Sequence, residues 1–559
     1  MDRFVQAVPP PADPYAGDPF LRSWLDRILG PAGHAAAKDR LSALAADVVG
    51  TLRAAHADAE AHPPTLIRYE PWGARVDRIE TSAGWQAQRA AAARHAVVAL
   101  PYLPDSRATW GAAARVVQHA LLHLYGPESA TFSCPVAMAD GAAALLSRPE
   151  VDPAVREAWL PRLVATDPAT AVTSGQWMTE SQGGSDLSRS STVASLVDGR
   201  WRLTGEKWFC SAADSAMAVA LARPDGAGPG SRVLAPFLIP RYGPDGATTA
   251  PGIRVHRLKD KLGTRALPTA EIGLDGAAAL PLGDPAGPGG LTRAMTLVVV
   301  TRLHNAAAAA GGMRRGLQYA LAFAAGRTVA GGPLSRSPLH RATLGTLAVD
   351  AAGAFALAAH AFALLGRVEV GADPYAAAEL RIVAPLAKLV TGKLAVASAS
   401  EYVESFGGAG YVEDTGVPRL LRDAQVLPIW EGTTNVLALD ALRATVRDDA
   451  AVPLLARLDA AQDIARGISP ALSDQLADAT AALRADLADV TADPTAVAVV
   501  AGARGLALRM GYALTAALLV EHAVTGDEQA EIAARLWARR RLRHEEIAVD
   551  AHHHLDLLA

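Results

Sequence analysis

One carboxylate of this chain stands out because of its immediate neighbours. Glu431 lies between the indole of Trp430 and Gly432, in the segment IWEGTTN at 429–435. An apolar neighbour desolvates a carboxylate and makes it a better proton acceptor, so Glu431 could serve as a general base. The residues alone leave open a second interpretation, a surface glutamate that caps the helix following it.

A polar segment with two adjacent glycines covers residues 177–186 and reads WMTESQGGSD. Glycines allow main-chain amides to approach an anion or a planar ring closely. The hydroxyl groups of Thr179 and Ser185 could bind ring heteroatoms or a pyrophosphate. An ordinary polar turn has the same composition, and this segment alone does not separate the two interpretations.

Two adjacent aromatic residues, Trp208 and Phe209, lie near the end of a predicted strand with the sequence GEKWFCS at 205–211. An aromatic face together with the hydroxyl of Ser211 could flank a planar cofactor. Aromatic pairs in strands belong more often to a hydrophobic core, which is the structural alternative for this pair.

Four regions of different composition must position these residues. Residues 1–170 are rich in Ala, Leu and Arg, with apolar residues three and four apart, which predicts an all-helical region. Short apolar runs between Gly and Pro turn signals predict a small β-barrel over 171–285. Helical spacing returns over 286–446, and an Ala-rich helical extension covers 447–559. The predicted fold class is therefore α+β.

The totals exclude several classes of function. At 559 residues the chain is too long for one hydrophobic core. The net charge is slightly negative, with 53 Lys plus Arg against 57 Asp plus Glu, which excludes a global positive field that would attract nucleic acid. Cys134 and Cys210 are too few for a disulfide framework or a thiolate metal site. The N-terminus lacks the pattern of a signal peptide. Arg504 and Arg509 interrupt the apolar stretch 496–520, which predicts a buried helix, no membrane span and a cytoplasmic protein.

Five segments together resemble the successive signatures of the acyl-CoA dehydrogenase family, in the right order and at the right separations. They read MTESQGGSD, GEKWFCS, RLKDKLGTR, ESFGGAGYVEDTGVPRLLRD and IWEGTTN. The stretches LIRY at 66–69 and SCPV at 133–136, with the long C-terminal extension, resemble the AidB-like (DNA alkylation response) branch. The resemblance implies an N-terminal helical domain, a middle β-barrel, a C-terminal four-helix bundle and an extra C-terminal helical domain.

The resemblance also implies a binding site for FAD. In the family pattern, Met178, Thr179 and Ser185 contact the flavin. Phe209 stands where many relatives place a Trp over the ring, and Ser211 where they place a Thr. The segment around the base completes the implied cofactor site with Ile429, Trp430, Gly432, Thr433 and Asn435.

Subunits share the cofactor site in this family. Arg327 matches an arginine that reaches the FAD pyrophosphate of a neighbouring subunit, and a guanidinium fork suits that dianion. Gly407 and Gly408 match a loop under the adenosine half, and Glu404 replaces the usual Gln there. The resemblance therefore implies a homo-oligomer, commonly a tetramer.

The family reaction begins at the base. As the carboxylate removes the α-proton of an acyl-CoA thioester, a hydride leaves the β-carbon for flavin N5, and hydrogen bonds to the thioester carbonyl stabilise the developing charge. Some relatives carry the base at the position that corresponds to Thr301, which cannot serve. The resemblance therefore assigns the catalytic role to Glu431 and predicts an FAD-dependent acyl-CoA dehydrogenase-type oxidoreductase.

The AidB-like branch suggests a second hypothesis, a flavin-containing, DNA-associated alkylation-stress protein with weak or no turnover. Residues 451–559 contain ten Arg, no Lys and fifteen Asp plus Glu, a charge of about -5, whereas a duplex binder carries a basic footprint. The candidate phosphate contacts are Arg443, Arg535, Arg539, Arg540, Arg541 and Arg543. The alternative for the last five is a solvated helix side paired with Glu545 and Glu546.

No metal site is predicted. His552, His553 and His554 are adjacent, but no further ligand set accompanies them, and we expect them in a disordered tail.

Overall fold

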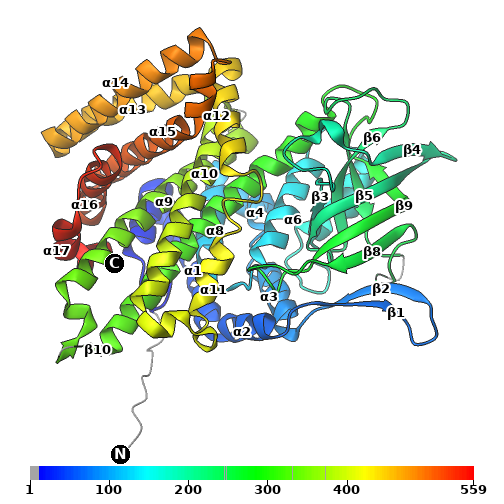
Figure 1. Cartoon of the computed structure of the whole chain (residues 1–559), viewed down its shortest axis with the longest axis horizontal. Coiled ribbons are helices and arrows are strands. Elements are labelled where there is room, and N and C mark those ends of the chain that lie inside the picture. The colour runs from blue at the N-terminus through cyan, green and yellow to red at the C-terminus, as the bar shows by residue number, and fades with distance from the viewer. Residues whose placement is uncertain (1–11, 244–245, 247, 330, 372) are drawn as a thin grey trace, which may run out of the picture. The chain divides into compact units, whose positions relative to one another are not determined.

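The computed structural model describes residues 12–559 apart from 244–245, 247, 330 and 372, so the N-terminal residues used to predict localisation lie mostly outside it. The chain forms two compact units, each built from separated segments (Figure 1). We name the first the barrel unit; it comprises Gly50–Leu103 and Glu128–His304. We name the second the helical unit; it comprises the described residues up to Val49, Pro104–Pro127 and Asn305–Ala559.

Seven strands of the barrel unit form the barrel that the sequence predicts within 171–285. They are β3 (Ser174–Trp177), β4 (Val193–Val197), β5 (Arg200–Ser211), β6 (Met217–Pro224), β7 (Ala235–Pro240), β8 (Ile253–Leu258) and β9 (Thr269–Pro281). The pairings β6–β4–β5–β9–β7–β6 close the sheet on itself, while β3 pairs with β6 and β8 with β9. Side chains such as Leu203, Phe237 and Ile272 fill the interior, so the barrel holds a packed core.

Helices complete the barrel unit. They are α2 (Arg53–Ala61), α3 (Ala83–Arg94), η2 (Leu100–Tyr102), α6 (Ser133–Leu146), α7 (Pro153–Leu163), η5 (Leu187–Arg189) and the first part of α8 (Gly290–Gly326). The close packing of α6 on α8 depends on Gly141, because a Cβ atom there would lie 2.8 Å from the Leu297 side chain. Two further short helices, η1 (Val48–Leu52) and η4 (Gly126–Glu128), lie where the chain passes between the units.

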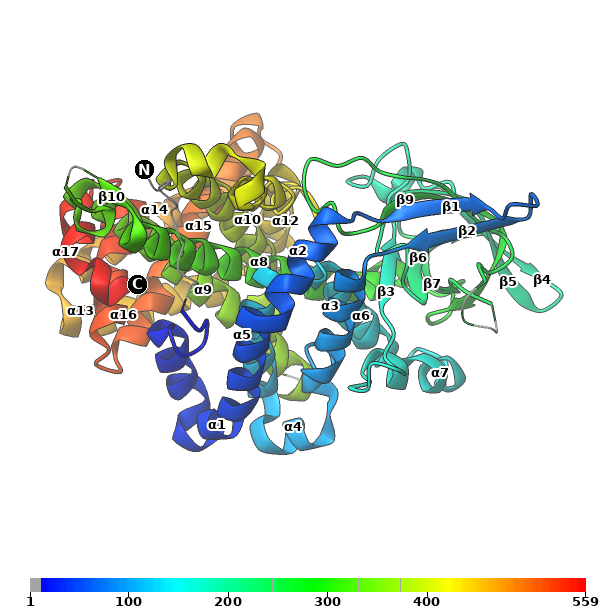
Figure 2. The same cartoon turned by 90° about the horizontal axis from the view of Figure 1, so that it is seen from below.

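The prediction of an all-helical opening is wrong over residues 65–80. An antiparallel hairpin of β1 (Thr65–Tyr69) and β2 (Arg75–Glu80) stands there, and Figure 2 shows its two strands side by side. Gly73 takes φ 92° in the connecting turn, a conformation that glycine adopts without strain. The Asp77 carboxylate accepts a hydrogen bond of 3.0 Å from the Val255 amide of β8, so partners distant in sequence hold the hairpin.

Long helices build the helical unit. From the N-terminal side they are α1 (Pro19–Asp47), α4 (Pro104–Trp110), η3 (Gly111–Ala113), α5 (Ala114–Tyr125), the second part of α8, α9 (Pro338–Gly371), α10 (Pro374–Ser405), α11 (Val417–Ala424) and α12 (Thr434–Asp448). Short elements join them: β10 (Thr328–Val329), β11 (Gly332–Pro333), η6 (Leu334–Arg336), η7 (Gly407–Tyr411) and η8 (Glu413–Thr415).

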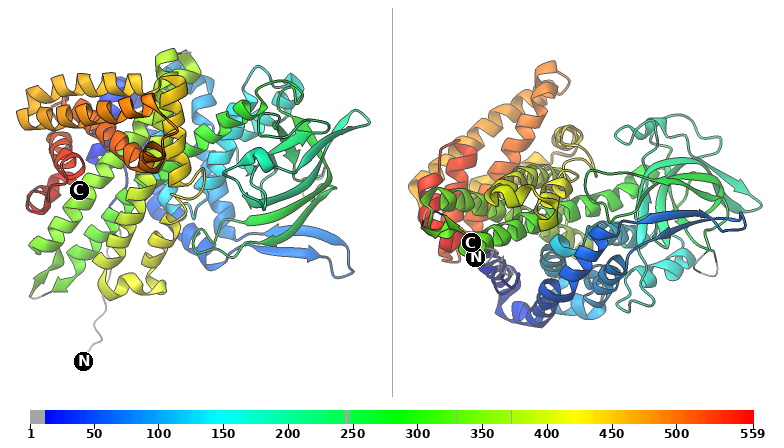
Figure 3. Two further views of the ribbon diagram at one scale, coloured as in Figure 1. Left: turned by 45° about the horizontal axis from the view of Figure 1, so that its top comes forward. Right: turned by 60° about the horizontal axis from the view of Figure 1, so that its bottom comes forward.

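The predicted C-terminal extension is also helical. Its elements are α13 (Ala451–Ile468), α14 (Pro470–Ala492), α15 (Val497–Ala523), α16 (Glu528–Trp537), η9 (Ala538–Leu542) and α17 (Ala548–Leu558). Figure 3 shows α13 and α14 side by side, in orange. The three adjacent histidines lie in α17, where Ala551 and Leu555 are buried, so the expectation of a disordered tail is wrong. The apolar residues of that segment find a partner surface on α9.

Among the residues that the structure describes, three helices are long and apolar enough to cross a membrane by length and composition, namely α9, α10 and α15. The most apolar windows of α9 and α10 are 94% and 83% buried inside the fold, and that of α15 is 39% buried. The burial of α15 lies mostly after Ala503, so the prediction of a buried helix over 496–520 holds for the later part of that stretch. The apolar windows of α9 and α10, and the later part of α15, are therefore buried parts of the fold.

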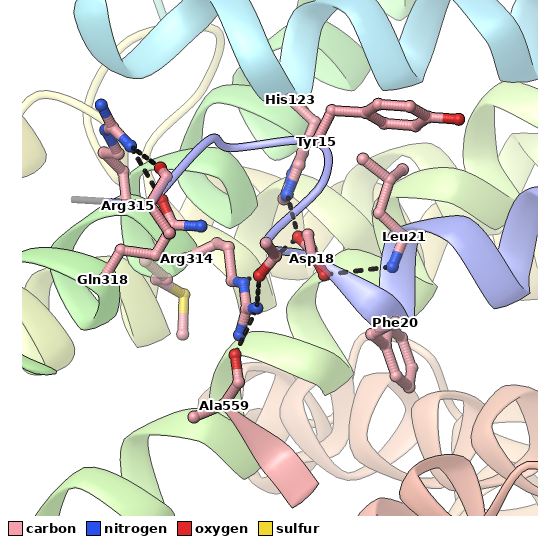
Figure 4. A network of polar contacts seen from close by, with 12 residues as sticks. Tyr15, Asp18, Phe20, Leu21, His123, Arg314, Arg315, Gln318 and Ala559 are labelled. Atoms are coloured by element: carbon pink, nitrogen blue, oxygen red, sulfur yellow. Dashed lines mark hydrogen bonds and ion pairs between the residues drawn. The ribbon is translucent and has the colours of Figure 1, made fainter. Parts of the chain in front are cut away.

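A buried polar network fixes the beginning of α1 (Figure 4). The Asp18 carboxylate caps α1 by accepting a 3.1 Å hydrogen bond from the Leu21 amide, and it lies 3.2 Å from Arg314 Nε and 3.4 Å from His123 Nε2. Arg314 also donates to the main-chain carbonyl of Ala559. Burial raises the pKa of Asp18, but Arg314 and His123 outweigh it and lower this pKa to about 2.

Candidate active site

The predicted site residues fall into two groups, one in each unit. In the barrel unit, the loop after β3 begins with Met178, which is buried, and continues with the half-buried Thr179. The Trp208 amide of β5 donates a 2.9 Å hydrogen bond to the Thr179 carbonyl. The structure thus brings together the two segments whose sequences suggested a planar ligand.

A buried ion pair anchors this loop. Lys207 Nζ donates to Glu180 Oε1 at 2.8 Å and to the Leu221 carbonyl at 2.8 Å, and the two charged side chains are 0% and 2% exposed. The Glu180 carboxylate also accepts from the amides and hydroxyls of Ser191 and Thr192. Burial raises the pKa of Glu180, but the Lys207 charge and these hydrogen bonds outweigh burial and lower this pKa to about 2.

Backbone conformation and steric contacts favour glycine at positions 183 and 184 of this loop. Gly183 takes φ 138°, and a Cβ atom on Gly184 would lie 2.5 Å from the hydroxyl of Thr179. Ser185 follows and is exposed. The loop therefore presents main-chain groups and hydroxyls to solvent, as binding of an anion or a ring requires.

Phe209 does not belong to the core. Its side chain is 55% exposed, which removes the structural alternative for this residue. Its neighbour Trp208 is half-buried, with Lys259 Nζ 3.4 Å from the centroid of its ring. Ser211 Oγ lies 3.2 Å from Thr269 Oγ1 on β9. An exposed aromatic face with a hydroxyl two residues away is the arrangement that a planar ligand needs.

In the helical unit, the carboxylate of Glu431 stands on a constrained loop between α11 and α12. Glu431 takes φ 57° and Gly432 φ 107°, so two successive residues have left-handed backbones. Trp430 Nε1 donates to Asn305 Oδ1 of α8, and Lys388 Nζ of α10 donates to the Gly432 carbonyl at 2.6 Å. Contacts on both sides of Glu431 therefore fix the direction of its main chain.

The loop leads directly into the N-terminus of α12. Thr433 is the N-cap residue, but its side chain makes no capping hydrogen bond, and both Thr433 and Asn435 are exposed. The first amides of a helix have no partner within the helix and attract anions. Ile429, at 58% exposure, offers an apolar surface just before the base.

The residues predicted to reach a neighbouring subunit are all exposed. Arg327 follows α8 directly, and its carbonyl accepts a 2.7 Å hydrogen bond from the Leu334 amide. Glu404 lies in the last turn of α10, and Gly407 and Gly408 begin η7. Gly407 takes φ 58°, which favours glycine at this turn.

The alternative base position offers no acid. Thr301 is buried, and its hydroxyl donates to the Leu297 and Val298 carbonyls of its own helix at 3.3 and 3.1 Å. The hydroxyl is thus engaged within α8.

Four residues that support the site were not identified from the sequence: Glu180, Lys207, Asn305 and Lys388. The first two lie inside recognised segments, but the residues beside Lys207 in the sequence, Glu206 and Trp208, give no sign that its charge is buried. Asn305 lies 125 residues from Trp430, and no local pattern identifies such a contact.

The arginines predicted as phosphate contacts in the extension are paired with carboxylates. Arg535 pairs with Glu531, Arg543 with Asp478, and Arg540 and Arg541 with Asp350. Arg539 pairs with Glu545 and Asp550 and approaches the carbonyl of Glu546. Arg443 is exposed on α12. The expected pairing with Glu545 is present for Arg539, whereas Arg540 and Arg541 are half-buried against the buried Asp350 and do not lie on a solvated helix side.

Among the residues with described positions, no group of three His, Cys, Asp or Glu side chains could hold a metal ion.

Comparison with known families gives three matches along the chain. The N-terminal domain of the adaptive response protein AidB matches residues 9–167, the middle domain of acyl-CoA dehydrogenases matches residues 175–277, and their C-terminal domain matches residues 288–446. The helical extension continues beyond the last match to residue 559.

Individual relatives agree with these matches. Acyl-CoA dehydrogenase family member 11 of Caenorhabditis elegans is 41% identical over 79% of this chain and 72% of its own length. The putative acyl-CoA dehydrogenase AidB of Escherichia coli K12 is 33% identical over 71% of this chain and 72% of its own length. The crystal structure of C. elegans ACDH-11 in complex with C11-CoA superposes with a TM-score of 0.89 at 35% identity, covering 98% of this chain and 93% of that one. This chain therefore belongs to the acyl-CoA dehydrogenase family, in which it carries an AidB-type N-terminal domain.

Proposed function

We propose that this protein is an FAD-dependent acyl-CoA dehydrogenase in which Glu431 removes the α-proton of the thioester. The observation that carries the proposal is the left-handed backbone of Glu431, held between the Trp430–Asn305 and Gly432–Lys388 contacts. A left-handed conformation costs a non-glycine residue about 1 kcal/mol or more, and it persists where the surroundings impose it, often at functional sites.

Three features fit FAD. An exposed aromatic face and a hydroxyl stand at Phe209 and Ser211, and the main chain of the loop at Thr179 is open to a ring. The N-terminus of α12 lacks a side-chain cap at Thr433 and suits a pyrophosphate. When bound, FAD supplies the acceptor for the hydride from the β-carbon.

The residues of the chain have distinct roles in this proposal. The Glu431 carboxylate takes and holds the proton, and the Trp430 indole shields it from water and makes it a better acceptor. Asn305 and Lys388 position that loop, and the Glu180–Lys207 pair positions the loop at Thr179. Arg327, Glu404, Gly407 and Gly408 reach the cofactor of a neighbouring subunit in a cytoplasmic homotetramer.

The substrate class follows from the relatives. The ACDH-11 structure, whose chain is 35% identical, holds C11-CoA, and we extend an acyl-CoA ligand to this protein.

The test is anaerobic reduction of the purified holoprotein. We expect a yellow protein whose visible flavin band bleaches when members of a panel of short, branched and long acyl-CoAs are added. Glu431→Gln should keep the colour and lose the bleaching, whereas Glu401→Gln, an exposed position on α10, should behave as the parent. A colourless protein that takes up no FAD, or bleaching at the parental rate in Glu431→Gln, would contradict the proposal.

The DNA-associated stress protein remains the other hypothesis, and the structural observations favour it less. The extension carries a charge of about -5, and its clustered arginines are held by carboxylates. Phosphate binding would have to replace those pairs. Salt-dependent binding of a DNA duplex that weakens when Arg539, Arg540 and Arg541 become Ala would reverse this preference.

A further inference from the structure

A cavity of about 290 Å³ lies inside the helical unit, among α1, the start of α5, α9, α13 and α15. Most of its lining is apolar, and the larger apolar side chains are Trp24, Ile28, Val116, Leu364 and Leu518. Small-molecule sites in proteins are commonly apolar concavities of roughly this size or larger, in which a few polar groups set the orientation.

Arg27 provides a cation in the wall of this cavity. Its Nε donates to His522 Nδ1 at 3.2 Å, and its guanidinium carbon lies 4.3 Å from the centroid of the Trp24 ring. Within the described part of the chain, no carboxylate forms an ion pair with Arg27. Burial, together with the Arg27 charge, lowers the pKa of His522 to about 4, so the imidazole is neutral near pH 7 and accepts the Arg27 hydrogen bond without contributing charge.

The other charged groups at the cavity are paired with one another. Arg457 binds Glu379 at 2.7 Å and Glu521 at 2.5 Å, and His360 binds Glu379 at 2.8 Å. Arg367, at the rim, binds Asp373 at 2.5 Å. Among the residues described, Arg27 is therefore the lining arginine that forms no ion pair, and the Glu521 charge nearby offsets its desolvation only in part, since burial still lowers the pKa of Arg27.

We propose that this cavity binds a small monocarboxylate with a short unbranched apolar tail. The carboxylate binds the guanidinium of Arg27, since a planar fork and a planar carboxylate form charge-assisted hydrogen bonds. The tail lies against Trp24, Ile28 and Leu518. A neutral ligand would leave Arg27 without a charged hydrogen-bond partner, and Glu521 in the same wall, which already acts on Arg27 electrostatically, would repel a dianion more strongly than a monoanion.

The ligand would act as a link between distant parts of the chain. The cavity is lined by α1 on one side and by α13 and α15 of the C-terminal extension on another. A ligand that binds only the folded unit stabilises it by an amount that grows with the logarithm of its free concentration above the Kd. Binding at this cavity therefore predicts a concentration-dependent stabilisation that does not require the flavin.

The experiment uses the full-length protein with hexanoate as the probe. Thermal unfolding is followed by circular dichroism, and binding is measured separately by isothermal titration calorimetry. We expect the melting temperature to rise continuously with hexanoate concentration and the binding heat to saturate, and we expect neither effect with hexanol or hexylamine at equal concentrations. Arg27→Gln should weaken hexanoate binding about tenfold or more, because it removes hydrogen bonds to a charged group. Arg22→Gln, on the same helix but outside the cavity lining, should keep the parental response.

A second variant keeps the test decisive if Arg27→Gln folds poorly. Ala363→Leu fills the cavity from α9 and leaves Arg27 in place, so it should also abolish the response. Hexanoate binding with parental affinity in both folded variants would overturn the proposal. Glu431→Gln and the protein stripped of flavin should both bind hexanoate with parental affinity. If either of them loses this binding, the ligand lies at another site and the proposal is overturned.

Discussion

Replacing Lys207 by methionine removes the buried cation that faces Glu180 while keeping a side chain of similar length. The remaining carboxylate is 2% exposed and would have to stay charged without its partner. Breaking one side of a buried ion pair costs about 3–5 kcal/mol. For a unit of this size that corresponds to a melting temperature lower by roughly 10 °C.

The same pair predicts a pH dependence. The pKa of Glu180 in the folded protein is about 2, against an ordinary value of 4.5. Because the folded-state pKa is the lower one, the carboxylate contributes about 3 kcal/mol of stability above pH ~4.5, and this contribution is lost as the pH falls toward 2. Lys207→Met should therefore be less stable at pH 7 and should lose less of its remaining stability between pH 5 and pH 2.

Differential scanning calorimetry across that pH range measures both effects, and Lys38→Met, which removes an exposed ammonium on α1, is the matched control. The double variant Glu180→Gln/Lys207→Met should lose less stability than the sum of the single changes, since the two residues are coupled. Loss of FAD affinity should accompany the instability, because the pair anchors the loop at Thr179. The reasoning is refuted if Lys207→Met melts with the parent and keeps its acid sensitivity.

Three further changes test other parts of the structure. Gly353→Ala places a methyl group 2.3 Å from the Trp537 ring and should lower the free energy of unfolding in urea by about 1–3 kcal/mol. The control Gly312→Ala, whose methyl group meets open space on α8, should be neutral or stabilise by up to about 1 kcal/mol. Equal effects of the two changes would contradict the close packing of α9 on α16. Asp18 has a pKa of about 2 against an ordinary 3.8, so Asp18→Asn should lose about 2 kcal/mol of folding stability at neutral pH. Its melting temperature, followed by circular dichroism, should also fall less steeply below pH 4 than that of the parent. A parental dependence of the melting temperature on pH would argue against the network at α1. Arg541→Gln breaks the ion pair with the buried Asp350 and should lower the melting temperature. It should leave the affinity for a DNA duplex, measured by fluorescence anisotropy at low salt, unchanged. Weaker duplex binding at unchanged stability would instead favour a phosphate contact.

Local sequence patterns were sufficient to predict the barrel and the helical regions around it. The turn signals and short apolar runs of 171–285 correspond to strands β3 to β9, since period-two patterns between turns determine strands directly. The β1–β2 hairpin was missed because its two short strands sit among long helical patterns, and its partner Val255 is 178 residues away from Asp77.

In the candidate site, too, residues in local motifs could be predicted from the sequence, whereas residues that act through distant contacts could not. Glu431 and the loop at Thr179 were identified from residue type and family resemblance, and their roles remain predictions. Asn305 and Lys388 were not, because each acts through a contact with a distant main-chain or side-chain group that periodicity does not encode. The pairing of Arg541 with Asp350, 191 residues apart, is likewise a property of the fold rather than of the arginine cluster.

The position of α1 has a consequence for how the protein is made. Ser23 and Arg27 hydrogen bond to His522, which lies 499 and 495 residues later, and Phe20 and Trp24 pack their rings on the same imidazole. A ribosome adds about 5–20 residues per second, so this first helix waits for on the order of half a minute or more before its partner emerges. Phe355, the other ring that packs on Phe20 and Trp24, emerges earlier than His522, so the aromatic surface of α1 is wholly uncovered only until then, and we expect holding chaperones to engage it in that period.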